Sequence, residues 1–122
     1  MLNEKDYCDY DTCVALMELG FPRWFLPYGI LSKKYLLRLY DAQKWLREEK
    51  KIEVNVELFG DYDRDADGKT LGTWVYYSYG ILNTTTADFI REYDLCTEYQ
   101  TYEEAVMEGI KEAVKILKEE RK

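Results

Sequence analysis

Residues 52–59 alternate between apolar and polar side chains, and this pattern constrains the fold more than any other part of the chain. A period of two places the apolar side chains on one face of a β-strand and the acidic and amide side chains on the other. A second strand is predicted over residues 72–82, which are rich in aromatic and β-branched residues. The two strands most simply form an antiparallel hairpin. Aromatic side chains on both faces of the second strand indicate that it is central or covered on its outer side.

Three helices are expected around this hairpin. Residues 11–19 and residues 39–50 each repeat apolar side chains at helical spacing, with charged residues between them. The last helix, over residues 102–119, has an apolar stripe along its whole length. Thr101 and Glu104 have the spacing of a capping box at its start, in which each residue satisfies a free amide of the first turn.

These elements predict an α+β fold of one domain, residues 1–122, with an antiparallel sheet packed against helices in two layers. Residues 83–100 are ambiguous. Alternation within this segment favours a third strand, whereas a short helix capped by Thr86 is the alternative. In residues 23–37 a proline and a glycine interrupt any helix, and only short extended pieces are expected.

The chain has 122 residues and no histidine, and this absence limits its chemistry. It excludes Ser-His-Asp and Cys-His catalytic sites and histidine-ligated metals. Among 24 acidic residues no carboxylate pair stands out as a general acid and base. No catalytic constellation is recognisable, so we expect a protein that is not an enzyme.

We expect a cytoplasmic location. Charged residues interrupt every apolar run before it reaches the ~18 residues of a membrane span, and the N-terminal residues are too acidic for a signal peptide. Three cysteines, Cys8, Cys13 and Cys96, lack a C-x-x-C spacing and are predicted to be free thiols. Cys13 and Cys96 are expected to act as small apolar fillers.

The net charge of −7 hides an uneven distribution. Residues 23–51 contain eight basic and three acidic residues, whereas residues 52–104 contain twelve acidic and three basic residues. Aromatic residues interleave with the basic ones in residues 23–51, so a nucleic-acid-binding module is one hypothesis. Its candidate contacts are Lys33, Lys34, Arg38, Lys44 and Arg47. The alternative is that the basic stretch pairs with acidic segments of the same domain, which the overall acidity favours.

An aspartate-rich segment, residues 61–67, follows the first predicted strand. Its spacing matches the start of a calcium-binding loop, in which alternate carboxylates converge on a hard cation. The candidate ligands for weak Ca²⁺ binding are Asp63, Asp65 and Asp67. Trp74 occupies the twelfth position of that loop, where a bidentate glutamate is needed. The interpretation without a metal is a solvated hairpin turn at Asp67 and Gly68.

The twelve tyrosines are the strongest indication of an interaction surface. Tyrosine combines a rigid apolar ring with a polar tip and is enriched at protein interfaces. The predicted surface on the second strand consists of Trp74, Tyr76, Tyr77 and Tyr79. We therefore expect a small acidic protein-interaction or accessory protein that binds a protein partner or itself. The alternative is that the rings merely cover the faces of a small β-rich domain.

Three stretches of the sequence resemble segments found together in other proteins. They are ALMELGF at residues 15–21, LYDAQKWLREE at residues 39–49, and YEEA at residues 102–105. Together they resemble a family of short uncharacterised proteins encoded by phages and mobile elements of gut bacteria. The resemblance implies a small cytoplasmic accessory protein. It implies no activity, cofactor or catalytic residue.

Overall fold

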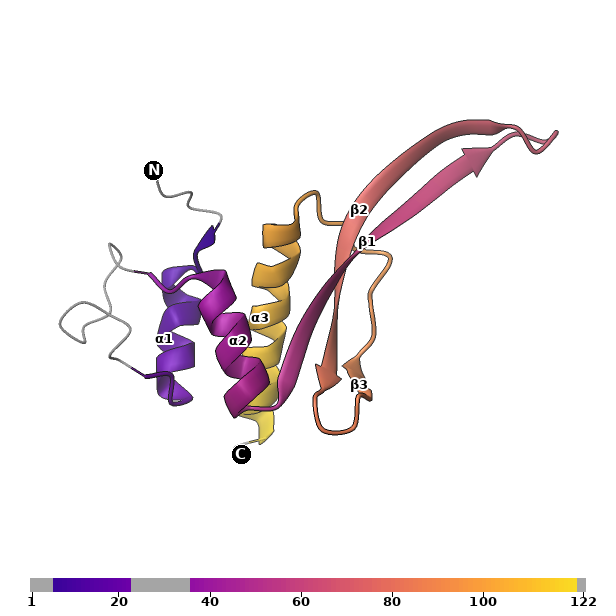
Figure 1. Cartoon of the computed structure of the whole chain (residues 1–122). Helices are drawn as coiled ribbons and strands as arrows, with labels where there is room; N and C mark the ends of the chain where they lie inside the picture. The colour runs from indigo at the N-terminus through magenta and orange to yellow at the C-terminus, as the bar shows by residue number, and fades with distance from the viewer. Residues whose placement is uncertain (1–5, 23–35, 121–122) are drawn as a thin grey trace.

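The computed structural model describes residues 6–22 and 36–120, and it shows three helices beside a three-stranded antiparallel sheet (Figure 1). The elements in chain order are α1 (Tyr10–Glu18), α2 (Leu39–Glu49), β1 (Ile52–Arg64), β2 (Thr70–Asn83), β3 (Phe89–Arg91) and α3 (Tyr102–Glu120). The predicted α+β fold is confirmed, and each predicted helix lies at its expected position. The short extended pieces predicted within residues 23–37 fall mostly outside the described residues.

The strands lie in the order β1-β2-β3, so β2 is the central strand, as the aromatic residues on both its faces indicated. β1 and β2 pair along their whole length as an antiparallel hairpin. β3 pairs only with the base of β2, where Ile81 lies opposite Arg91. Farther along β2, Tyr77 and Tyr99 exchange two backbone hydrogen bonds of 2.8 and 3.1 Å. The described chain therefore flanks β2 on this side only as far as Tyr77.

The segment between β2 and α3 differs from its prediction. Of the strand favoured over residues 83–100, only Phe89–Arg91 forms. The rest of the segment forms turns, because its side chains accept hydrogen bonds from nearby backbone amides and these amides do not pair with a neighbouring strand. Asn83 Oδ1 accepts a hydrogen bond from the Thr85 amide at 2.8 Å, and Asp94 Oδ1 accepts one from the Cys96 amide at 3.0 Å. Cys96 is exposed in this turn, so its prediction as an apolar filler is wrong.

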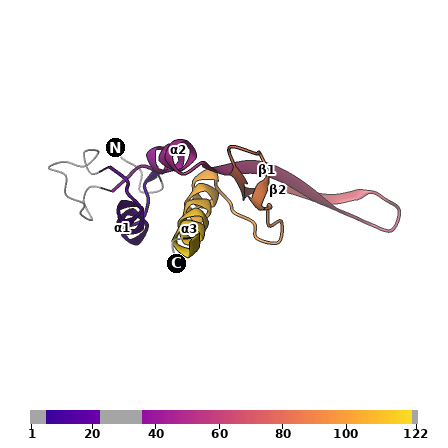
Figure 2. The same cartoon turned by 90° about the horizontal axis from the view of Figure 1, so that it is seen from below.

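The helices form a layer on one face of the base of the sheet (Figures 1 and 2). α2 and α3 contact the sheet, and α1 packs against α3 on the side away from it. We call the sheet face toward the helices the inner face and the opposite one the outer face. Gly109 of α3 permits a close approach to the inner face, because a Cβ at this position would collide with Val54 and would lie 3.2 Å from Cγ of Tyr79.

The hydrophobic core lies among the three helices and the inner face of the sheet base. Its members form one cluster that includes residues from every helix and from β1 and β2. The largest side chains with almost no exposed surface are Leu16, Leu46, Val54, Ile81, Val106 and Ile110. These residues include the apolar positions predicted from helical and strand periodicity in α2, β1 and α3.

The chain that joins β3 to α3 covers the outer face of the sheet base. The Tyr93 ring packs edge-on against Phe59 of β1 with the centroids 5.3 Å apart, and its hydroxyl is hydrogen-bonded to Asn55 Nδ2. Ser78 of β2 donates a hydrogen bond of 3.1 Å to the carbonyl of Asp94. The base of the sheet is therefore covered on both faces, which explains why its strands carry aromatic residues outward as well as inward.

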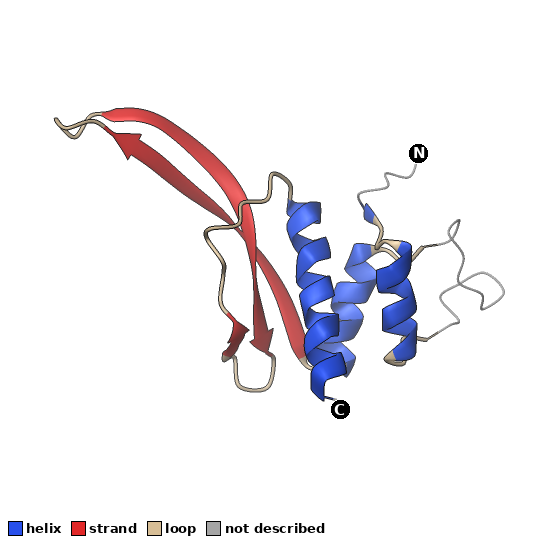
Figure 3. Ribbon diagram, turned by 180° about the vertical axis from the view of Figure 1, so that it is seen from behind, coloured by secondary structure: helices blue, strands red, loops and turns tan. Residues whose placement is uncertain are grey.

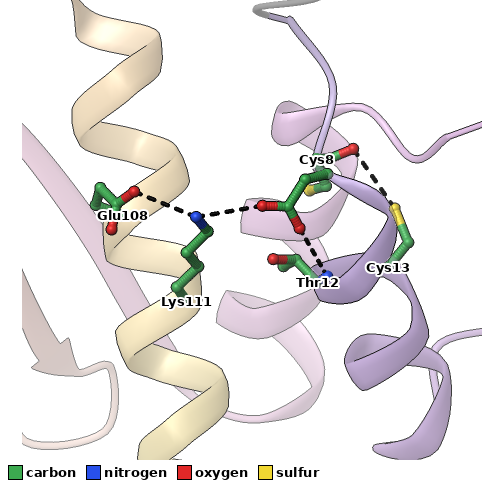
Figure 4. Close-up of polar contacts among 6 residues, drawn as sticks. Cys8, Thr12, Cys13, Glu108 and Lys111 are labelled. Atoms are coloured by element: carbon green, nitrogen blue, oxygen red, sulfur yellow. Dashed lines mark hydrogen bonds and ion pairs between the residues drawn. The ribbon is translucent and has the colours of Figure 1, made fainter.

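Asp9 links α1 to α3 through the Thr12 amide and the ammonium group of Lys111, and Figure 4 labels these two partner residues. Its Oδ1 caps α1 by accepting a hydrogen bond of 2.8 Å from the Thr12 amide, and its Oδ2 lies 3.2 Å from Nζ of Lys111. Lys111 also pairs with Glu108 at 3.3 Å. Burial opposes ionisation of Asp9, but the bonds from Thr12 and Lys111 outweigh it, so the pKa of Asp9 is lowered.

Replacing Asp9 with asparagine is expected to make stability less sensitive to acid. A carboxylate whose pKa is lowered by folding stabilises the protein above its unfolded pKa of about 4, and this contribution is lost as the pH falls through the folded value. Asparagine keeps the capping oxygen but does not titrate. The difference in melting temperature between wild type and Asp9→Asn should be largest at neutral pH and shrink below about pH 4. A difference that is constant with pH in thermal unfolding followed by circular dichroism contradicts this assignment.

Candidate functional site: the hairpin arm

The distal half of the β1–β2 hairpin, residues 58–75, extends away from the rest of the protein (Figures 1 and 3). We call these residues the arm. Both strands are longer than predicted, because β1 continues past residue 59 to Arg64 and β2 begins at Thr70. Both figures show the arm projecting past the ends of the helices. The arm is therefore held by β1–β2 pairing, with few contacts to the body of the protein.

The inner face of the arm is apolar and exposed. Leu58 is 57% exposed, Tyr62 50% and Val75 64%. In the β1–β2 register Leu58 lies opposite Tyr77, and Gly60 lies opposite Val75, so Val75 shares this face with Leu58 and Tyr62. The guanidinium of Arg64 lies over the Tyr62 ring, 4.5 Å from its centroid. Soluble monomers seldom expose contiguous apolar patches, and such patches mark contact sites.

The outer face of the arm is acidic around one tryptophan. Glu57, Asp61 and Asp63 share this face, since they alternate with the inner-face residues of β1. Trp74 lies opposite Asp61 and donates a hydrogen bond of 3.3 Å from Nε1 to Glu98. Among the described residues, no salt bridge involves the acidic residues of this face.

The edge of β1 along the arm carries free backbone groups. Alternate residues of β1 direct their N–H and C=O away from β2. Val54 is one of them, and its carbonyl accepts a hydrogen bond of 2.7 Å from Nε2 of Gln43, by which α2 closes the edge at that point. The backbone N–H and C=O groups of Leu58 and Gly60 also point away from β2. Within residues 6–22 and 36–120 these groups have no hydrogen-bond partner. The next outward amide, that of Tyr62, donates to the neighbouring side chain of Asp61.

The tip of the arm is a turn built on Asp65. Its Oδ1 accepts hydrogen bonds of 2.9 Å from the amides of Asp67 and Lys69, and its backbone pairs with Lys69 and Gly68. Gly68 adopts a φ of 82°, as a residue at the predicted turn requires. The part of the chain that the structure describes holds no group of three or more acidic or cysteine side chains arranged for a metal. Ca²⁺ binding by Asp63, Asp65 and Asp67 stays a prediction.

The four residues predicted as an interaction surface lie in different surroundings. Tyr76 is only 4% exposed, because it stacks on Phe59 beneath the chain that joins β3 to α3. Tyr77 and Tyr79 are half-buried, the latter against α3. Trp74 is exposed at the start of the arm. The apolar arm residues Leu58, Tyr62 and Val75 were not singled out by the sequence, and of the three only Tyr62 has a polar residue on both sides.

The basic residues proposed for nucleic-acid binding are only partly described. Lys33 and Lys34 lie outside the described residues. Arg38 precedes α2 and is hydrogen-bonded to Tyr7, which raises the pKa of Arg38. Lys44 is exposed on α2, and Arg47 pairs with Glu53 of β1 at 3.5 Å. The Arg47 contact is the kind of internal pairing expected between the basic stretch and the acidic segment.

The buried thiols do not form a reactive site. Cys8 and Cys13 are both fully buried, and Cys13 Sγ accepts a hydrogen bond of 3.4 Å from the Leu37 amide. The hydrogen bond with Cys13 and burial together raise the pKa of Cys8, so this thiol stays protonated. The hydrogen bonds with Cys8 and with the Leu37 amide lower the pKa of Cys13, but its side chain has no exposed surface. Both side chains therefore serve the packing of α1 and the residue that precedes Asp9.

Comparison with models of known families, with curated proteins and with solved structures finds no match to this chain. None of the described helices has both the length and the apolar character needed to cross a membrane.

Proposed function

We propose that this protein is a protein-interaction module and that the arm is its contact surface. The observation that carries the proposal is the exposure of Leu58, Tyr62 and Val75 together on one face of a projecting hairpin. Apolar and aromatic side chains of this kind are the residues that provide most binding energy when a partner covers them. A small accessory protein of phage or mobile-element type, acting in the cytoplasm, fits this role.

The arm is favoured over the rest of the surface by its geometry. Of the other exposed apolar side chains, Tyr40 lies on α2, whereas Phe89 and Tyr102 each contact another ring, that of Tyr93 and that of Tyr77. Scattered residues of this type are normal on soluble proteins, whereas a contiguous set is not. The arm also carries a free backbone edge beside its exposed apolar side chains, so one partner can contact both.

The test compares wild type with the double variant Leu58→Ser/Val75→Ser and with Tyr40→Ser as the matched control. Each protein is immobilised, exposed to lysate of the organism that encodes it, and the retained proteins are then purified and titrated individually. Removal of two apolar contacts should weaken the true complex at least about tenfold. Tyr40→Ser should bind as wild type does.

The proposal fails if no purified protein binds wild type, or if a purified complex tolerates the double variant. Circular dichroism must show that the double variant keeps its helices and its melting temperature. Since Leu58 and Val75 are more than half exposed, their replacement is expected to leave the core intact.

A further inference from the structure

We propose that the free β1 edge of the arm, residues 56–62, pairs with an extended strand of a partner protein in which apolar and basic side chains alternate. This inference rests on the proposed function, because it names how the arm contacts its partner. It follows from the backbone edge, the two faces of β1 and the glycine at position 60.

The backbone edge is suited to receive one more strand. Exposed sheet edges bind extended peptides through main-chain hydrogen bonds, and pockets beside alternate residues give specificity. The Gln43 contact with Val54 marks one end of the available edge, and the local bond between Asp61 and the Tyr62 amide lies at the other. Leu58 and Gly60 lie between these limits, with outward groups unpaired among the described residues.

The two faces of β1 define the chemistry of the added strand. Its successive side chains would point alternately to the inner face and to the outer face. On the inner face they would lie beside Leu58 and Tyr62, which favours apolar residues. On the outer face they would lie beside Glu57, Phe59 and Asp61. The two carboxylates have no salt-bridge partner in the described chain and therefore favour lysine or arginine.

Gly60 has no role in the internal packing of the arm. A Cβ at this position would meet its nearest neighbours, atoms of Trp74 and Val75, only at 3.9 Å, which is ordinary contact. Glycine weakens a strand interior and often marks a place where another chain approaches closely.

A second copy of this chain is a poorer occupant of the edge. If residues 56–62 of two copies pair antiparallel over their full length, Glu57 lies opposite Asp61 of the other copy. Like charges directly opposite one another destabilise a sheet. The acidic outer face therefore selects a partner of opposite charge.

The test uses the full chain and a synthetic peptide of about seven residues that alternates valine and lysine, a length typical of strands. Amide hydrogen exchange is followed by NMR with and without the peptide at up to about 1 mM. The peptide should slow exchange of the Leu58 and Gly60 amides at least about tenfold, and more strongly at low salt. A peptide with glutamate in place of lysine should have no effect.

Two variants at one position separate edge pairing from other contacts. The Gly60 amide points away from β2, so Gly60→Pro removes an edge donor without removing a β1–β2 bond, whereas Gly60→Ala retains the donor. Binding of the lysine peptide should fall at least about tenfold in Gly60→Pro and persist in Gly60→Ala.

Three results would overturn the inference: unchanged exchange at Leu58 and Gly60, equal effects of the two peptides, or protection that appears with protein concentration alone. If Leu58→Ser/Val75→Ser weakens a natural complex that Gly60→Pro leaves intact, the arm is the contact surface but does not pair at its edge. If neither variant weakens that complex, the proposed function fails as well.

Discussion

A Gly109→Val variant is expected to lose about 3 kcal/mol of folding free energy or more, the upper range for overpacking a close-packed interface. A Cβ at this position collides with Val54, which is fully buried and has no room to move. The branched side chain would also press on Tyr79, whose Cγ lies 3.2 Å from the Cβ position. Since α3 contacts both β1 and β2, the clash separates the helix layer from the sheet.

Urea unfolding measures this loss, and Gly72→Val is the matched control. Gly72 lies in β2 on the arm, and a Cβ there meets no atom within 4 Å. The control should change the free energy of unfolding by about 0.5 kcal/mol or less. Equal unfolding midpoints for Gly109→Val and wild type would falsify the close contact between α3 and the sheet.

Leu16→Ala is expected to cost about 2–5 kcal/mol, as for other fully buried leucines. Leu16 lies on α1 and is completely buried in the cluster that also contains α3 residues. If the chain is one cooperative domain, as the sequence predicts, the loss should appear as a lower midpoint of a single unfolding transition.

The exposed position Asp11 on the same helix provides the control for Leu16→Ala. Asp11→Ala should cost about 0.5 kcal/mol or less. Unfolding is followed by far-ultraviolet and near-ultraviolet circular dichroism, which report on backbone and on aromatic packing. Separate midpoints by the two probes would show that α1 unfolds independently and would contradict a single domain.

Local sequence patterns predicted the elements of the fold well. The alternation in residues 52–59 identified β1, and Thr101 marked the start of α3, where its hydroxyl accepts a hydrogen bond of 3.2 Å from the Glu104 amide. Capping residues and periodic patterns involve only residues that are close in the sequence, so they can be recognised without knowledge of the tertiary contacts. The length of the hairpin was underestimated because Gly60, Gly72 and the aspartates resemble turn residues.

The site was harder to predict, because exposure depends on contacts between distant parts of the chain. Tyr76 is covered by the segment that returns from β3, which no local pattern places there. Conversely, the alternation that includes Leu58 is typical of a face buried against helices, yet the helices end before the arm does (Figure 2). The projection of the hairpin exposes Leu58, and the segment that follows β3 buries Tyr76, so the expected burial is reversed at both residues.

Beyond the contacts of Phe59 with Tyr93 and of Trp74 with Glu98, the arm depends on β1–β2 pairing, so its distal part can open by local unfolding while the helices and the sheet base remain folded. A protease should therefore cut first near residues 65–69, at the tip, and leave a nicked protein whose body still melts cooperatively. The amides at the sheet base, enclosed on both faces, should exchange only when the whole molecule unfolds. We thus expect two levels of stability in one chain, an arm that opens locally and a base that opens only globally, with the boundary near Tyr77 and Tyr99.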